Sequence, residues 1–273
     1  MTKNRLRGSV VLVATAVVML ASPARGQVSD TIYHKSTLIT AKDFGMAAAF
    51  GLATVAVAPL DRYFANRLQD SATQSNRWLH GAATGFRILG SQGSLAAGAG
   101  LYLIGKAAKK NRTADLGLHS TEAMLGADLV STGMKVFFGR ARPFVDVSNN
   151  YDFQLFRGLR DDKYRSFPSG HSTNAFAFAA TVSRETEMWW PKSRWYIGPV
   201  MYGGATLVGL SRMYNNQHWA SDVIGGAAVG TIVGLKVVKF QHSHPGNRLD
   251  RTFLSVSIAP SATGGRPRFS LGF

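Results

Sequence analysis

The chain has 273 residues, enough for one sizeable domain, and its 31 Lys and Arg against 15 Asp and Glu give a formal net charge of +16. Cysteine is absent, which excludes a disulfide framework, a thiol nucleophile and a thiolate metal site. A basic balance of this size favours anionic partners. Because the basic residues are scattered and no nucleic-acid-binding motif is present, a membrane surface or a phosphorylated ligand is favoured over nucleic acid.

The N-terminus has the layout of a secretory signal peptide. Lys3, Arg5 and Arg7 precede an apolar run over residues 9–21, and small residues follow as far as Gly26. The apolar run is too short to span a membrane comfortably. We therefore expect residues 1–26 to be a signal peptide that exports the chain to the cell envelope, with an uncleaved anchor as the alternative.

Residues 27–245 predict one all-α domain, a bundle of about six helices. The apolar and small-residue patterns place these helices at residues 43–60, 81–107, 116–138, 170–184, 195–210 and 219–240. Residues 61–77 read as a polar connector and residues 144–166 as a polar loop. In the last helix, Gly225, Gly226, Gly230 and Gly234 are spaced for close helix packing.

A first cluster of charged residues lies at the end of the third helix. Lys135 and Arg142 are about two helical turns apart, so both side chains can face the same way, and Pro143 ends the helical pattern. Arg140 falls on a different helical face, where we expect it to be solvated. Two fixed cations of this kind suit a ligand that carries several negative charges.

A second cluster, Pro168-Ser169-Gly170-His171, opens the fourth helix. The N–H groups at a helix N-terminus form an anion site, and Gly170 lets the backbone approach the anion closely. The Ser169 hydroxyl adds a donor. His171, at the same place, is positioned to act as a general acid.

The third cluster, residues 211–222, holds Arg212, His218 and Asp222. His218 and Asp222 are four residues apart, a spacing that brings two helical side chains together. A carboxylate bonded to one ring nitrogen would leave the other nitrogen free as a nucleophile or base. Each cluster alone also fits an ordinary turn, helix cap or surface pair. The three in this order, with complementary chemistry, indicate a phosphoryl-transfer site.

The order K-x6-R-P, P-S-G-H and S-R-x5-H-x3-D over residues 135–222 resembles the type 2 phosphatidic acid phosphatase superfamily, with every motif position matched. That superfamily includes lipid phosphate phosphatases, bacterial acid phosphatases and vanadium haloperoxidases. The resemblance implies that His218 forms a phosphohistidine, that Asp222 orients it and that His171 protonates the leaving group. It also implies that phosphate is bound by Lys135, Arg142, Ser169, Gly170 and Arg212, with no metal and no cofactor.

The tail, residues 246–273, shows a period-2 alternation on both sides of Gly264 and Gly265, which predicts a short β-hairpin. Segments 43–60, 195–210 and 219–238 are apolar enough either to cross a membrane or to form a core. We expect a membrane-associated domain with its site facing the periplasm, and a fully exported soluble domain is the alternative.

The expected activity is hydrolysis of a phosphomonoester or a lipid (di)phosphate, with a phosphorylated lipid or a small phosphoester as substrate. Two alternatives belong to other classes: a vanadate-dependent haloperoxidase, and a non-catalytic envelope protein that only binds anions. The sequence leaves the substrate and the oligomeric state open.

Overall fold

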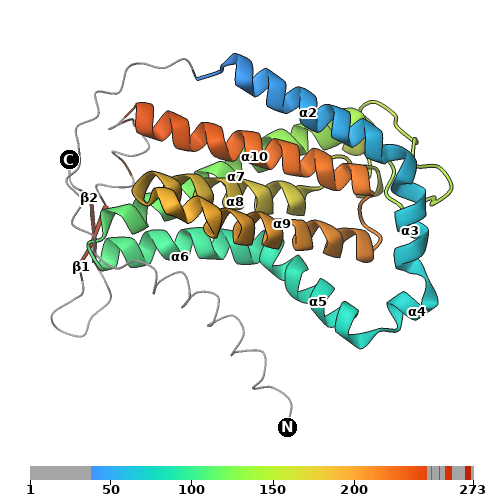
Figure 1. Cartoon of the computed structure of the whole chain (residues 1–273), viewed down its shortest axis with the longest axis horizontal. Coiled ribbons are helices and arrows are strands. Elements are labelled where there is room, and N and C mark those ends of the chain that lie inside the picture. Colours follow the sequence, from blue (N-terminus) through green and yellow to red (C-terminus); the bar gives the residue numbers. More distant parts are fainter. Residues whose placement is uncertain (1–37, 245–246, 248–251, 253–255, 260–267, 272–273) are drawn as a thin grey trace, which may run out of the picture. The chain divides into compact units, whose positions relative to one another are not determined.

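The computed structural model describes residues 38–244, 247, 252, 256–259 and 268–271. The predicted signal peptide, residues 1–26, lies outside the described residues. The helices of the described part run in chain order as α2 (Ala41–Val57), α3 (Asp61–Gln69), α4 (Ser71–Gln74), α5 (Arg77–Ile88), α6 (Ser94–Ala107), α7 (Asn111–Phe138), α8 (Gly170–Trp189), α9 (Ile197–Tyr214) and α10 (Ala220–Ser243) (Figure 1). Short 3-10 turns follow α2 and α8 (Ala58–Leu60, Pro191–Trp195) and interrupt the 144–166 loop (Arg157–Leu159, Asp162–Tyr164).

The predicted all-α class is confirmed, but six helices are too few. In the described part of the chain, eight helices are longer than a single turn. The predicted polar connector, 61–77, is itself largely helical and forms α3 and α4. The predicted helix 81–107 is two helices, because a π-helical turn at Leu89–Gly93 separates α5 from α6.

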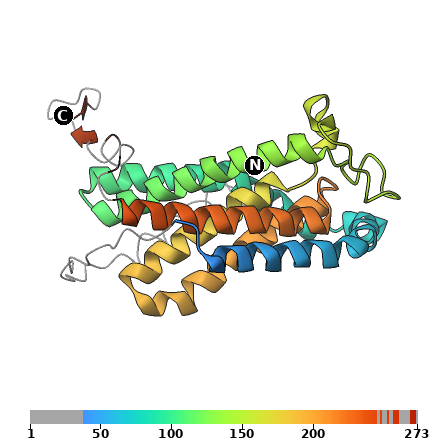
Figure 2. The same ribbon diagram turned by 90° about the horizontal axis from the view of Figure 1, so that it is seen from above.

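The centre of the bundle is α8, which packs against α7, α9 and α10 (Figures 1 and 2). The alanines of α8 pack on two sides of this helix. Ala177 packs with Ala123 and Ala127 of α7, whereas Ala175 and Ala179 pack with residues of α9. Side chains this small allow the helix axes to come close together, so the ends of the three neighbouring helices are held firmly around the end of α8.

The contact between α8 and α10 depends on glycine. A Cβ atom added at Gly226, Gly230 or Gly234 would collide with backbone oxygens of α8 or of its N-cap residue. The prediction of close packing from these glycines is therefore confirmed for Gly226, Gly230 and Gly234. This close approach places the start of α10 beside the start of α8.

Helix α2 lies along α10 and has no buried residue (Figure 2). Its apolar side chains face outward; Phe44, Leu52 and Val55 are each about 70% exposed. At one end, Lys236 of α10 forms an ion pair with Asp43 and donates a hydrogen bond to the Leu38 carbonyl at 2.9 Å.

Among the described residues, two stretches are long and apolar enough to cross a membrane, Ala41–Gln69 and Ala220–Ser243. Buried core helices can also pass this test.

Two short segments of the tail, β1 (Val256–Ala259) and β2 (Arg268–Leu271), pair antiparallel with Val256 opposite Leu271. The segment that would form the turn, residues 260–267, lies outside the described residues. The hairpin tail as a unit therefore stays a prediction, and the fold of the described chain is defined by its helices.

Candidate active site

The candidate site forms where α7, α8, α9 and α10 have adjacent ends. Helix α7 ends at Phe138, and Gly139 follows in the left-handed conformation with φ of 54°, a common helix C-terminus. Lys135 is in the last turn of α7 and Arg212 in the last turn of α9. His218 lies in the loop between α9 and α10. The three motif clusters therefore reach one place from different helices.

The residues of the predicted anion site, Ser169 and Gly170, lie at the N-terminus of α8. Ser169 is the N-cap residue, and its hydroxyl oxygen accepts a hydrogen bond from the Ser172 hydroxyl at 2.9 Å. The Ser169 amide donates to the Asp222 carbonyl at 3.0 Å, which ties α8 to α10. A Cβ atom at Gly170 would collide with the Lys135 ammonium. The lysine nitrogen therefore lies directly against the backbone that opens α8, and a larger residue at position 170 would displace it.

Arg142 does not extend the helical face of Lys135. It lies beyond the end of α7, and the turn at Gly139, rather than helical phase, directs it to the site. Its guanidinium donates to the Gln217 side chain at 2.5 Å and to the Asp162 carboxylate at 2.7 Å. The Asp162 side chain is largely exposed, so an incoming phosphate can compete with it for the arginine.

Arg212 is almost fully buried beside the other cations. Its Nε atom has no hydrogen-bond partner among the described residues. Burial, opposed by no nearby acid, lowers the pKa of Arg212 to about 10, so the group remains charged at neutral pH. A buried guanidinium with a free donor is prepared to bind an anion.

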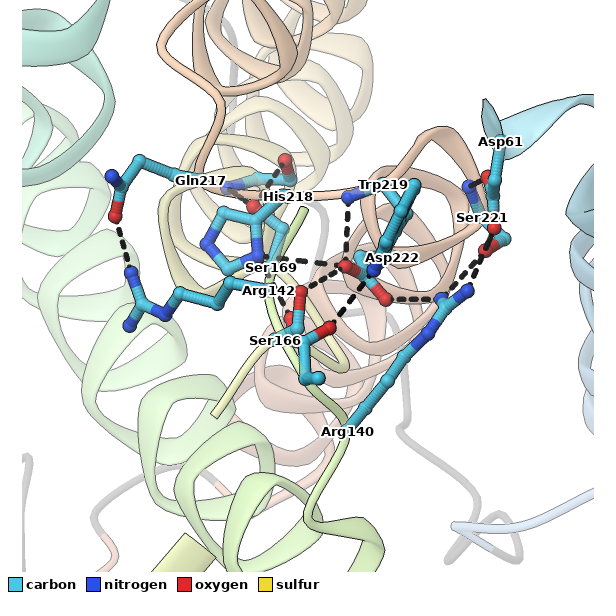
Figure 3. Close-up of polar contacts among 12 residues, drawn as sticks. Asp61, Arg140, Arg142, Ser166, Ser169, Gln217, His218, Trp219, Ser221 and Asp222 are labelled. Atoms are coloured by element: carbon cyan, nitrogen blue, oxygen red, sulfur yellow. Dashed lines mark hydrogen bonds and ion pairs between the residues drawn. The ribbon is translucent and has the colours of Figure 1, made fainter. Parts of the chain in front are cut away.

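His218 has one ring nitrogen fixed and one left open (Figure 3). Nδ1 lies 2.8 Å from the Ser166 carbonyl oxygen. Because a carbonyl can only accept, Nδ1 carries the hydrogen and Nε2 carries a lone pair. Among the described residues, Nε2 has no hydrogen-bond partner. The ring therefore presents an unprotonated nitrogen.

Asp222 lies beside His218, as the spacing predicted, but without a close hydrogen bond to the ring. Its Oδ2 is 3.7 Å from His218 Nδ1, too far for a direct hydrogen bond. The carboxylate instead accepts from the Ser166 hydroxyl at 2.5 Å and from the Trp219 amide at 2.8 Å (Figure 3). Asp222 thus lies close enough to stabilise positive charge on the His218 ring, and it fixes Ser166, whose carbonyl orients that ring.

The protonation of the two histidines follows from burial and from the cations. Burial lowers the pKa of His218 to about 4, so the ring is neutral at pH 7. Burial, followed by repulsion from Arg212, lowers the pKa of His171 to about 3. A bound anion would offset the cations around His171 and would make it easier for this ring to hold a proton.

Arg140 is the main residue that sequence reasoning misplaced. The expectation of a solvated side chain is wrong, because the guanidinium is only 2% exposed. It donates to Asp222 at 2.6 Å and to Asp61 of α3 at 2.8 Å (Figure 3). It also donates to the Asn150 carbonyl. Because helix α7 ends at Phe138, position 140 is not on a helical face.

Asp61 is the second residue that the sequence did not reveal. Its carboxylate accepts from the Ser221 amide at 2.8 Å and from the Ser221 hydroxyl at 2.5 Å, in the first turn of α10 (Figure 3). Asp61 and Ser221 are 160 positions apart, and no local pattern connects them. We call Asp61, Arg140, Ser221 and Asp222 the Arg140 network. This network joins α3 to the start of α10, next to His218.

An all-α fold that places fixed cations near an unprotonated histidine nitrogen defines a class of anion-binding domains. Residues 117–244, just under half of the chain, match the model of the PAP2 superfamily. This confirms the family predicted from the motifs at residues 135–222.

Several curated proteins are similar over the same part of the chain. A lipid A 1-phosphatase of Porphyromonas gingivalis is 39% identical over 41% of this chain and 20% of its own length. A lipid A 4'-phosphatase of the same organism is 36% identical over 41% of this chain and 44% of its own length. The putative undecaprenyl-diphosphatase YbjG of Escherichia coli is 32% identical over 38% of this chain and 46% of its own length. The chain thus spans less than half the length of each of these relatives.

A solved structure supports the fold. The transmembrane PAP2-type phosphatidylglycerolphosphate phosphatase from Bacillus subtilis superimposes with a TM-score of 0.56, over 77% of this chain and 100% of that chain. The two sequences are 23% identical, so the likeness concerns the helical architecture alone.

Proposed function

We propose that this chain is a metal-independent phosphatase that hydrolyses a lipid-linked phosphate at the cell envelope through a phosphohistidine on His218. The observation that carries the proposal is the hydrogen bond from His218 Nδ1 to the Ser166 carbonyl at 2.8 Å. It leaves the lone pair on Nε2, beside Lys135 and Arg142, whose charges reach the ring. A neutral imidazole among fixed cations suits attack on a phosphate.

In the first step, Nε2 of His218 attacks phosphorus and the bond from phosphorus to the leaving oxygen breaks. His171, which takes up a proton once the anionic substrate is bound, gives that proton to the leaving oxygen. Lys135, Arg142 and Arg212 stabilise the negative charge on the oxygens that do not leave. The His218 ring gains positive charge, which the Asp222 carboxylate 3.7 Å from Nδ1 stabilises.

In the second step, water attacks phosphorus and the P–N bond breaks. His171, now neutral, accepts a proton from that water and returns to its starting state. His218 leaves as a neutral ring with its lone pair on Nε2 again. Phosphate is released, and Asp162 and Gln217 can bind Arg142 as they do in the free protein.

The proposed substrate class is a phosphorylated lipid, either a phosphomonoester or a diphosphate. Helix α2 offers an apolar surface with no buried residue, which suits contact with a bilayer. The relatives named above as lipid A phosphatases and an undecaprenyl-diphosphatase point to the same class. The proposed location is the periplasmic side of the envelope, which rests on the predicted signal peptide.

The test is phosphate release by the purified full chain in detergent with EDTA present. Three substrates are compared: a prenyl diphosphate, phosphatidic acid and a small aryl phosphate. We expect release from one or both lipids and little from the aryl phosphate. Preference for the aryl phosphate would overturn the lipid assignment and would favour a soluble acid phosphatase.

The matched variants are His218→Gln and His80→Gln, since His80 is an exposed residue of α5. We expect turnover to be lost in the first and unchanged in the second. Full turnover by His218→Gln would overturn the proposed mechanism. Circular dichroism of both variants checks that the helices remain intact.

A further inference from the structure

A second polar cluster lies within the bundle and takes no part in the proposed reaction. It consists of His119 of α7, Glu185 of α8 and His242 of α10, called here the His–Glu cluster. His119 Nδ1 is 2.6 Å from Glu185 Oε1, and His242 Nε2 is 3.0 Å from both Glu185 oxygens. Glu185 and His119 are buried, while 26% of the His242 side chain is exposed.

The His–Glu cluster is far from the candidate active site, although the same three helices carry both. His119 is near the start of α7, and Glu185 and His242 are near the ends of α8 and α10. The active-site residues occupy the other end of each helix. At 1.5 Å per residue, the separation along each helix is about 20–30 Å. The cluster therefore needs an explanation of its own.

Its chemistry fits a transition-metal ion. Two imidazoles and one carboxylate form a common zinc ligand set, and imidazole ligands suit zinc, copper and nickel better than magnesium or calcium. The three ligand atoms all lie within 4.8 Å of one another. Bonds of about 2.0–2.2 Å to one ion would place the ligand atoms roughly 3.3–3.6 Å apart. Small side-chain movements would satisfy that geometry.

The electrostatic setting also favours a cation. The charges of Glu122 and Asp115 act on His119 in addition to that of Glu185. The partly exposed side of His242 provides a route for an ion from solvent. A proton on a coordinating ring nitrogen would leave to solvent or move to the other nitrogen of the same ring on binding.

We propose that His119, Glu185 and His242 bind one divalent transition-metal ion, with zinc as the ion that the ligand set best fits. The ion would hold together the ends of α7, α8 and α10 that lie away from the active site. It would have a structural role, so phosphate release in EDTA tests the active site separately. The alternative is a metal-free cluster in which the two histidines form hydrogen bonds with a buried glutamate.

The experiment uses the full chain in detergent, with any purification tag removed and metals stripped by a chelator. Zinc chloride is added, unbound metal is dialysed away, and bound zinc is measured by elemental analysis together with the unfolding temperature. We expect one zinc ion per chain and a higher unfolding temperature. Magnesium chloride at the same concentration should produce neither effect.

Two variants and two controls sharpen the test. Glu185→Gln keeps the size of the side chain but removes its charge, and His242→Gln changes the most exposed ligand. Both should weaken zinc binding at least tenfold. His80→Gln and His244→Gln should bind zinc as the unaltered chain does. Absence of stoichiometric zinc, or equal binding by folded Glu185→Gln and His242→Gln, would overturn the proposal.

Discussion

At the scale of single residues, Arg140 is the clearest case of a side chain that acts through another. It touches neither His218 nor the place where phosphate would bind, but it holds Asp222 at 2.6 Å and Asp61 at 2.8 Å. Asp222 in turn holds Ser166, whose carbonyl fixes the His218 ring. We infer that Arg140 is a positioning residue for His218, the proposed nucleophile.

Arg140→Lys keeps the charge but cannot reproduce a planar fork that contacts two carboxylates. We expect kcat to fall about tenfold while KM changes little, because the cations proposed to bind phosphate are untouched. Arg140→Ala should instead lower the free energy of unfolding by about 3–5 kcal/mol, since it leaves two buried carboxylates without their partner. Steady-state kinetics and thermal unfolding measure both effects.

The matched control is Arg160→Lys in the exposed loop, which should leave kcat and stability unchanged. A KM effect without a kcat effect in Arg140→Lys would show that Arg140 acts on substrate binding. That outcome would contradict the positioning role.

The pH dependence of activity also depends on a single residue, His218. His218 must be unprotonated to attack, and burial lowers its pKa to about 4 from an ordinary value of 6.5. The acid limb of kcat/KM should therefore lie near pH 4, well below 6.5. A limb centred near 6.5 in a folded enzyme would contradict the buried, neutral ring.

The lowered pKa of His218 also sets the direction in which the stability of the fold changes with pH. Between pH 6.5 and about 4 the unfolded chain binds a proton at position 218 that the folded chain does not. The contribution of His218 to stability is therefore fully present above pH 6.5 and falls as the pH decreases toward 4. In His218→Gln this part of the pH dependence should disappear.

At the scale of elements, the close packing of α8 and α10 places both histidines. Gly230→Ala would push a methyl group into the α8 backbone, and we expect a loss of about 1–3 kcal/mol in the free energy of unfolding. Gly133→Ala of α7 has open space around the added methyl and should be neutral or slightly stabilising. Equal stability of the two variants would contradict the packing argument.

The sequence predicted the helices around the candidate site well because their signals are local. Helices α7 to α10 have strong apolar or small-residue patterns, and the motif residues occupy their ends. Arg140 and Asp61 could not be placed in this way. Arg140 follows a left-handed turn that removes it from helical phase, and Asp61 meets Ser221 only through the tertiary fold. The polar composition of residues 61–77 also concealed two helices, because α3 is amphipathic and buries only a few of its side chains.

At the scale of the whole molecule, the exposed apolar surface of α2 is the feature that a lipid bilayer would cover. Leu52→Gln combined with Val55→Gln should reduce the fraction of protein that sediments with lipid vesicles, because both side chains are exposed and apolar. Leu52→Met with Val55→Met keeps the surface apolar and should bind as before. Unchanged vesicle binding by the Gln variant would contradict a membrane role for α2.

The central claim is that phosphate becomes bonded to His218, and trapping that bond tests it most directly. Full-length protein would be mixed with substrate carrying labelled phosphate, quenched in alkali within one turnover and digested. We expect label on the peptide that contains His218, stable in alkali, lost in acid and absent from His218→Gln. Turnover without label on that peptide, or label on another residue, would contradict the account.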